Sequence, residues 1–189
     1  MIKLLVIDNY DSFTYNLVHI LEEKEDIGLT VARNDKLRVE DAENYDKILL
    51  SPGPGIPDEA GNMKAIIKKY APSKSILGVC LGHQGIGEIF GAKLVNLDTV
   101  YHGVATPVRV LKDDLLFKGV PQEFAGGRYH CWAVSDHELP FELDVLARGG
   151  DGEIMAMRHN HFDVRGVQFH PESIMTEYGK EIVFNWLYR

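Results

Sequence analysis

A cysteine between two glycines is the residue of this chain best placed to do chemistry. Cys80 lies in Gly78-Val79-Cys80-Leu81-Gly82, after the short apolar run 75–79 and before a segment with helical spacing. Glycines on both sides let a strand turn sharply into a helix, so that the sulfur is exposed at the carboxyl end of a sheet. The helix N-terminus also favours a thiolate. The pattern favours a nucleophile, with an ordinary buried thiol as the alternative.

A nucleophilic cysteine needs a base, because a free thiol with a pKa of about 8.5 is mostly protonated at neutral pH. Among eight histidines, His170 stands out in Gly166-Val167-Gln168-Phe169-His170-Pro171-Glu172, at the end of an apparent strand. Pro171 stops the strand and fixes the backbone, so His170 and Glu172 can lie on one side of it. Glu172 is then placed to orient and stabilise the imidazole, which predicts a Cys80, His170, Glu172 triad.

Two other histidines and a metal site are the alternatives to this triad. His83 and His130 compete for the role of base, although His83 lies within one turn of the helix after Cys80, a poor location for reaching back to the sulfur. A His-x-Glu pattern also occurs in zinc deaminases, but these need a later Pro-Cys-x-x-Cys, and no cysteine follows His170. No other residues have a metal-ligand spacing. We therefore predict neither a metal nor a cofactor.

A loop rich in proline and glycine offers backbone donors near the cysteine. Ser51-Pro52-Gly53-Pro54-Gly55 follows the apolar run Lys47 to Leu50, and the ends of neighbouring parallel strands meet at one edge of a sheet. The N–H groups of Gly53 and Leu81 are the predicted oxyanion hole. A simple turn is the alternative, because proline and glycine are common in any loop.

Predicted strands and helices alternate along the first half of the chain, and they must position these residues. Apolar runs predict buried strands, and helical spacing between them predicts covering helices. Ser12 or Thr14 is expected to cap the first helix. The second half has mostly strand patterns before a last helix. We predict an α/β fold with an open, mostly parallel central sheet, helices on both faces and an antiparallel extension in the second half. The expected strands are 3–8, 29–32, 47–50, 75–79, 101–110, 129–134, 153–158 and 166–169, and the expected helices begin after the first strand (through 23), at 63–70, after Cys80 (to 90) and at 176–187.

Length and composition bound the remaining possibilities. With 189 residues, 45% of them hydrophobic, we expect residues 1–189 to form one domain. No stretch approaches the roughly 18 apolar residues of a membrane span, and no secretory segment is recognisable, so we expect a cytoplasmic protein with no membrane association. A net charge of -8 without a basic cluster argues against nucleic-acid binding. Two cysteines, Cys80 and Cys131, make a disulfide framework implausible.

Five segments together resemble the class I glutamine amidotransferases, and specifically the glutaminase subunits of anthranilate synthase and 4-amino-4-deoxychorismate synthase. The likeness covers nearly the whole chain. Its segments are Asp8-Asn9-Tyr10-Asp11-Ser12-Phe13-Thr14, Ser51-Pro52-Gly53-Pro54-Gly55, Leu77-Gly78-Val79-Cys80-Leu81-Gly82-His83-Gln84, Arg128-Tyr129-His130 and Gly166-Val167-Gln168-Phe169-His170-Pro171-Glu172-Ser173. The first of them separates this branch from the guanosine-monophosphate-synthetase type.

The resemblance implies a specific reaction and a specific partner. Cys80 would form a γ-glutamyl thioester with L-glutamine and release ammonia to a chorismate-binding synthase subunit. The lining of the glutamine pocket would be Gly53, Pro54, Gly55, Gln84, Cys131 and Trp132. Anthranilate synthase, for tryptophan biosynthesis, is the favoured partner system. The aminodeoxychorismate synthase of folate biosynthesis, or service to both, is the alternative.

Two departures from the family pattern and two other functions stay open. The family usually has serine and leucine where this chain has Cys131 and Trp132, and a thiol is a much weaker hydrogen-bond partner than a hydroxyl. After His102-Gly103 the family often continues with Lys-Thr-Ser, whereas Val104-Ala105-Thr106 follows here. A catalytically silent binding module and a hydrolase acting alone on γ-glutamyl compounds are the competing functions.

Overall fold

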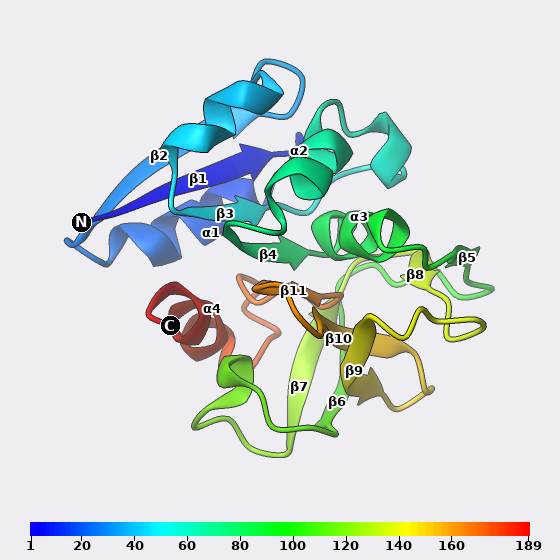
Figure 1. Ribbon diagram of the computed structural model, residues 1–189. Coiled ribbons are helices and arrows are strands. Elements are labelled where there is room, and N and C mark those ends of the chain that lie inside the picture. The colour runs from blue at the N-terminus through cyan, green and yellow to red at the C-terminus, as the bar shows by residue number, and fades with distance from the viewer.

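The computed structural model describes residues 1–189, which form four α-helices and eleven strands (Figure 1). The strands are β1 (Ile2–Asp8), β2 (Ile27–Arg33), β3 (Lys47–Leu50), β4 (Ser75–Val79), β5 (Leu94–Asn96), β6 (Val104–Val110), β7 (Glu123–Arg128), β8 (Trp132–Val134), β9 (Leu143–Gly149), β10 (Ile154–His159) and β11 (Val164–Val167). The α-helices are α1 (Thr14–Glu22), α2 (Met63–Tyr70), α3 (Leu81–Ile89) and α4 (Gly179–Leu187). Three short 3-10 helices are η1 (Val39–Asn44), η2 (Pro57–Glu59) and η3 (Leu115–Phe117).

Nine strands form one mixed sheet in the order β2-β1-β3-β4-β11-β10-β9-β6-β7. The first five of these are parallel to one another, and the last four continue the sheet with antiparallel pairs. Strands β5 and β8 form a separate antiparallel pair. This arrangement confirms the predicted α/β fold with a mostly parallel sheet and an antiparallel extension.

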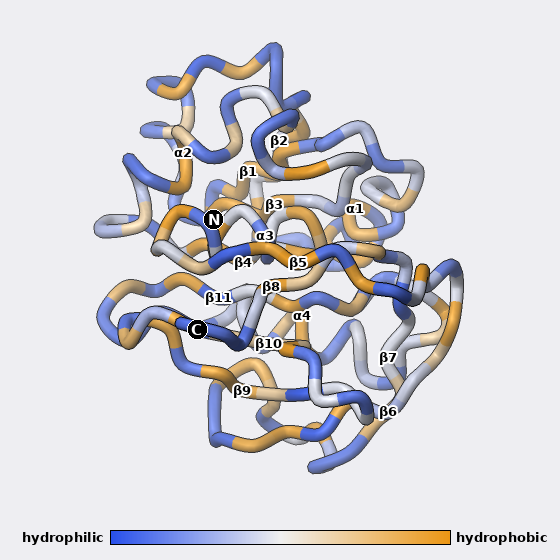
Figure 2. The backbone as a smooth tube through the Cα atoms, turned by 90° about the vertical axis from the view of Figure 1, so that its right-hand side faces the viewer, coloured by the Kyte–Doolittle hydropathy of each residue, from blue (hydrophilic) through white to orange (hydrophobic).

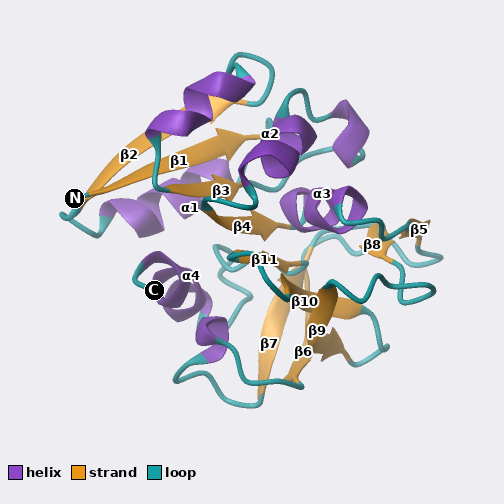
Figure 3. Cartoon of the chain, viewed as in Figure 1, coloured by secondary structure: helices purple, strands orange, loops and turns teal.

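Helices cover both faces of the parallel strands, as expected for strands whose side chains are apolar on both sides (Figure 3). Leu4 and Val6 of β1 belong to a core that includes α1 and α4, whereas Leu5 and Ile7 belong to one that includes α2 and α3. The hydrophobic stretches of β1 and β3 run through the middle of the molecule (Figure 2). The period of two along β1 therefore divides its side chains between two cores.

Several predicted boundaries were wrong in the second half of the chain. Strands β5, β7 and β9 were not predicted, and the expected strand 129–134 is only β8, which lies outside the main sheet. Residues 129–131 instead connect the end of β7 with β8. The last parallel strand, β11, covers 164–167 rather than 166–169. Beyond its pairing with β4, the chain stays attached to the sheet, since the Gln168 N–H donates to the Met155 carbonyl and the His170 N–H to the Gly127 carbonyl, each at 2.9 Å.

Two helix starts also differ from the prediction. Neither Ser12 nor Thr14 caps α1: the hydroxyl of Thr14 donates instead to Asp8, 3.0 Å away, and the carboxylate of Asp11 accepts from the Phe13 N–H at 2.7 Å. Helix α4 begins at Gly179 rather than Thr176. The Thr176 hydroxyl accepts from the Gly127 N–H, which ties this segment to β7.

A helix that crosses a lipid bilayer needs about 20 consecutive, predominantly apolar residues. None of the helices of this chain has both the length and the apolar character for such a crossing.

Candidate active site

Cys80 occupies a strained turn between β4 and α3. Its backbone has φ +52° and ψ -99°, in a region that residues other than glycine rarely adopt. The turn is closed by contact between the flanking glycines, because a Cβ added to Gly78 would lie 2.4 Å from the carbonyl carbon of Gly82. A Cβ added to Gly82 would lie 2.6 Å from the Cβ of Leu50. Both glycines are therefore required sterically, as the sequence pattern predicts.

The loop after β3 lies against this turn. Gly53 is so close to its neighbours that an added Cβ would be 2.6 Å from Leu81 Cδ2 and 2.6 Å from Asn9 Cβ. Asn9 also holds the loop by hydrogen bonds, since its side-chain amide donates to the Ser51 carbonyl at 2.7 Å and its N–H donates to the Ser51 hydroxyl at 2.9 Å. The N–H groups of Gly53 and Leu81 donate to no protein acceptor. Both N–H groups therefore lack a partner within the protein, and Gly53 lies against the Leu81 side chain.

His170 and Glu172 follow β11, on the other side of β4 from the loop. Nδ1 of His170 lies 2.7 Å from Oε1 of Glu172, and both side chains are almost completely buried. The ring packs against Tyr129, with ring centroids 4.8 Å apart, and edge-on against Phe13, at 5.9 Å. These contacts fix the plane of the imidazole, and Nε2 has no hydrogen-bond partner within the protein.

The charge on His170 is favoured in spite of its burial. Burial lowers the pKa of a histidine, but the Cys80 sulfur and the Glu172 carboxylate outweigh it and raise the pKa of His170 well above 6.5. Cys80 and His170 follow neighbouring parallel strands, β4 and β11. The surroundings of His170 therefore favour its protonated form, the imidazolium.

A cavity of about 210 Å³ opens next to the sulfur. It collects residues from three segments that are distant in sequence, and the six residues predicted to line a glutamine pocket are all among them. The lining is Gly53, Pro54, Gly55, Cys80, Gln84, Tyr129, His130, Cys131 and Trp132. Tyr129 and His130 were not predicted as lining residues, although both belong to a motif that the sequence analysis singled out. A larger cavity of about 750 Å³ lies elsewhere, around Val110 to Val120.

The two competing histidines have other surroundings. His83 is fully buried against Gly166 of β11, does not line the cavity, and burial lowers its pKa to about 3. His130 lines the cavity, but its Nε2 faces the guanidinium of Arg128 at 3.3 Å and the carboxylate of Glu153 at 3.5 Å. Burial lowers its pKa as well. Among the three candidates, only His170 has a raised pKa.

Sequence reasoning did not single out Gln168, which lies beside the Cys80 sulfur. Its side chain is completely buried, and its amide nitrogen lies 3.5 Å from the Cys80 sulfur. One partial signal was present: Gln168 precedes His170 by two residues, and side chains at that spacing share one side of an extended segment.

Acidic, histidine and cysteine side chains are the groups that hold most metal ions in proteins. No three of them come close enough together in this chain to hold one.

Comparison with known proteins bears on what this site does. A family model described as "Glutamine amidotransferase class-I" matches residues 5–189. The chain belongs to this family. Membership makes it a glutamine amidotransferase, and this confirms the enzyme class predicted from the motifs.

Named members of this amidotransferase family resemble the chain over nearly its full length. Anthranilate synthase component 2 of Pseudomonas aeruginosa is 47% identical over 191 residues, which cover 97% of this chain and 94% of that protein. Aminodeoxychorismate/anthranilate synthase component 2 of Bacillus subtilis is 44% identical over 186 residues, 97% of this chain and 95% of that protein. A crystal structure of a Thermoplasma acidophilum protein, provisionally described as one of the subunits of GMP synthase, matches with a TM-score of 0.88 and 28% identity over 99% and 92% of the chains.

Proposed function

We propose that this amidotransferase hydrolyses L-glutamine with Cys80 as nucleophile, His170 as base and acid, and Glu172 as the residue that orients His170. The observation that carries this proposal is the position of three groups at the carboxyl ends of adjacent parallel strands. Strand β4 lies between β3 and β11 and presents Cys80, while the neighbours lead into the Gly53 loop and the His170–Glu172 pair. Residues 1–189 are proposed to act as one glutamine amidotransferase domain.

The first half of the reaction forms the thioester. His170 takes the thiol proton through Nε2, and the sulfur attacks the γ-carboxamide carbon of glutamine. The negative charge that develops on the carboxamide oxygen is stabilised by the N–H groups of Gly53 and Leu81, which have no other acceptor. When the tetrahedral intermediate collapses, the C–N bond breaks and His170 returns its proton to the leaving nitrogen, so that ammonia departs.

The second half returns the enzyme to its starting state. Water loses a proton to His170 as it attacks the thioester carbon, and the C–S bond of the intermediate then breaks. Glutamate leaves, and the sulfur recovers a proton from the imidazole. Glu172 keeps Nδ1 of the ring occupied throughout, so Nε2 is the nitrogen that exchanges protons.

The pocket for the amino-acid end of glutamine is proposed to be the cavity beside the sulfur. Gly53, Pro54, Gly55, Gln84, Cys131 and Trp132 are the proposed substrate-binding residues, and all of them line it. The Trp132 carbonyl accepts a hydrogen bond from the Gln84 side chain at 2.8 Å. A backbone carbonyl of this segment therefore makes a hydrogen bond at the pocket wall. That hydrogen bond does not depend on whether the side chain at position 131 is a hydroxyl or a thiol.

The partner is proposed to be a chorismate-binding synthase subunit that receives the ammonia. Anthranilate synthase is favoured because the Pseudomonas aeruginosa relative is named as its component 2. The Bacillus subtilis relative is named for both synthases, which supports the aminodeoxychorismate system, or service to both, as the alternative.

Two other functions make different predictions from this one. A silent binding module would release no glutamate even with a synthase present. A hydrolase acting alone would turn over glutamine equally well with and without the synthase. The proposed glutaminase should be strongly activated by the synthase, because closing the site on demand prevents wasteful hydrolysis.

The deciding experiment is reconstitution with each candidate synthase, glutamine and chorismate. The expected result is glutamine-dependent anthranilate with the anthranilate synthase chain, and a synthase-dependent rise in glutamate release. Accumulation of aminodeoxychorismate alone would identify the alternative pathway. Absence of glutamate with every synthase, while each synthase still works with added ammonia, would reject the proposed function.

A further inference from the structure

A chain of hydrogen bonds leads from the cavity wall to the nucleophile. The side-chain nitrogen of Gln84 donates to the Trp132 carbonyl at 2.8 Å and to the side-chain oxygen of Gln168 at 3.2 Å. The nitrogen of Gln168 then lies 3.5 Å from the Cys80 sulfur. None of these contacts joins two members of the proposed triad.

The direction of this chain follows from its first member. A backbone carbonyl can only accept, so the Gln84 group that faces Trp132 must be the NH₂ end. The same NH₂ group bonds to Gln168, which must therefore turn its oxygen toward Gln84. Its own NH₂ group is left facing the sulfur. The amide of Gln168 is thus oriented as a donor to Cys80.

Burial and the backbone make this donor rigid. Gln168 is 0% exposed, and its backbone N–H donates to the Met155 carbonyl of β10 at 2.9 Å. The Cys80 N–H donates to the Val167 carbonyl at 2.8 Å, so the two backbones are also joined directly. A donor held in this way stabilises negative charge on the sulfur more than it stabilises the neutral thiol.

We propose that Gln168 is a further catalytic residue, which donates a hydrogen bond to the Cys80 thiolate and links the sulfur to Gln84 in the substrate cavity. This inference rests on the proposed function, since it assumes that Cys80 is the nucleophile. Cys80 and Gln84 line the cavity and Gln168 does not, so a ligand that contacts Gln84 also influences the sulfur indirectly, through Gln168. Substrate binding and thiolate stabilisation are coupled by one side chain.

The test measures the reactivity of Cys80 directly in the full-length protein. Iodoacetamide alkylation is followed from pH 5 to 10, and modification at Cys80 is separated from that at Cys131 by peptide mapping. The variants are Gln168→Met, which removes the donor without adding charge, and Gln168→Glu, which places an acidic group beside the sulfur. Gln122→Glu is the matched control, because Gln122 is exposed and does not line the cavity beside Cys80.

For Gln168→Met we expect the pH of half-maximal alkylation to rise and the rate at pH 7 to fall about tenfold, as for loss of one hydrogen bond to a charged group. A similar or larger fall is expected for Gln168→Glu. In the complex with the synthase, kcat for glutamine hydrolysis should fall more than KM rises. Gln122→Glu should behave as the parent protein does.

Unchanged alkylation profiles in a folded Gln168→Met protein, checked by its thermal unfolding, would overturn the inference. If Gln168→Met fails to fold, the same measurement on Gln168→Glu decides. Failure of the proposed function would look different: the parent Cys80 would itself react no faster at neutral pH than an unperturbed thiol, and no glutamate would form with the synthase present.

Discussion

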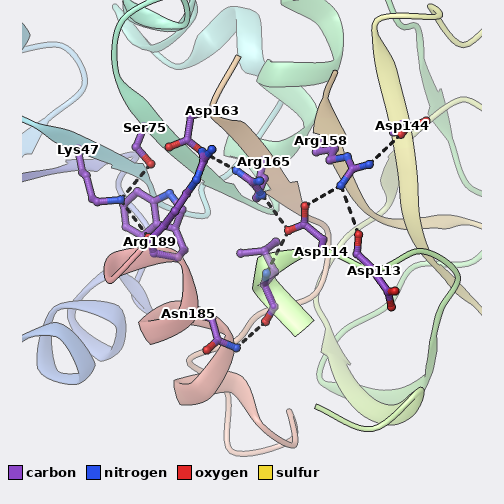
Figure 4. A network of polar contacts seen from close by, with 12 residues as sticks. Lys47, Ser75, Asp113, Asp114, Asp144, Arg158, Asp163, Arg165, Asn185 and Arg189 are labelled. Carbon is purple, nitrogen blue, oxygen red and sulfur yellow. Dashed lines mark hydrogen bonds and ion pairs between the residues drawn. The ribbon is translucent and has the colours of Figure 1, made fainter. Parts of the chain in front are cut away.

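The two ends of three adjacent strands, β3, β4 and β11, differ in how their polar groups are satisfied. At the amino ends, Lys47 donates to Ser75 and to the Trp186 carbonyl, and Asp163 pairs with Arg165 (Figure 4). Arg165 continues to Asp114, which also binds Arg158. Each of these charges has a partner.

At the carboxyl ends the same strands lead into groups that are strained or open. Cys80 has a positive φ, the N–H groups of Gly53 and Leu81 have no acceptor, and Oε2 of Glu172 has no hydrogen-bond partner. Unsatisfied buried groups cost stability, and proteins keep them where a ligand or a reaction uses them. The paired charges at the amino ends stabilise the fold, whereas the open groups at the carboxyl ends are the ones that the proposed reaction would use.

The largest expected effect comes from the carboxyl ends. His170→Asn should lower kcat/KM for glutamine hydrolysis by about 10³- to 10⁴-fold, because the sulfur loses its general base. The measurement is glutamate release by the reconstituted complex. His137→Asn, at a highly exposed position, is the control and should be neutral. A loss below about tenfold would show that another group activates Cys80.

A change at the amino ends should act on stability and spare the chemistry. The Asp114 side chain is 1% exposed and pairs with two arginines. Asp114→Asn should lower the free energy of unfolding by about 2 kcal/mol, since both arginines lose a charged hydrogen-bond partner although each keeps one other carboxylate. Urea denaturation measures this, with Asp58→Asn as the exposed control. A large loss of kcat/KM in the folded Asp114→Asn protein would contradict the view that the amino ends serve stability and not the reaction.

The loop after β3 provides a finer probe of the carboxyl ends. Gly53→Ala would place a Cβ 2.6 Å from Asn9 and Leu81, so the loop must shift. We expect kcat to fall about 100-fold through loss of one oxyanion donor, with a smaller change in KM. Gly150→Ala is the matched control, because an added Cβ there meets nothing within 4 Å. Equal activity of the two variants would argue that Gly53 has no role in the reaction.

His83 is a buried imidazole without an anionic partner, and its pKa is shifted in the opposite direction to that of His170. Burial lowers the pKa of His83 to about 3, so below pH 6.5 the unfolded chain binds a proton that the folded chain does not. The contribution of His83 to the free energy of unfolding is fully present above pH 6.5 and is about 2 kcal/mol smaller at pH 5. His83→Gln should remove that part of the acid destabilisation, measured by urea denaturation at pH 7.5 and 5. His137→Gln should not, and an equal pH dependence in parent and His83→Gln would contradict the assignment.

The sequence predicted the first half of the fold well because local pattern and burial agree there. The strands Lys47–Leu50 and Ser75–Val79 and the helix Met63–Tyr70 have the predicted bounds, since each is a short run with one clear periodicity. Strands β7 and β9 were missed. Glu123–Arg128 contains two glycines and few apolar residues, and it forms a strand because it pairs with β6 along its whole length.

The candidate site was predictable where motifs are short and was incomplete where contacts are long-range. Cys80, His170 and Glu172 could be named from Gly-x-Cys-x-Gly and His-Pro-Glu, because each spacing constrains its own backbone. Gln168 could not be assigned a role in this way. Its contacts with Gln84 and Cys80 join residues that are separated by 84 and 88 positions in the sequence, and only the fold brings them together.

In the proposed mechanism, Cys80 is held as a nucleophile at the end of β4 and faces a glutamine pocket. The most direct test of this mechanism is labelling with a diazo-ketone analogue of glutamine, followed by peptide mapping and by glutamate release in the reconstituted complex. The expected result is modification of Cys80 alone, in proportion to the loss of glutaminase activity. Exclusive labelling of another residue such as Cys131, or full activity after Cys80 is modified, would contradict it.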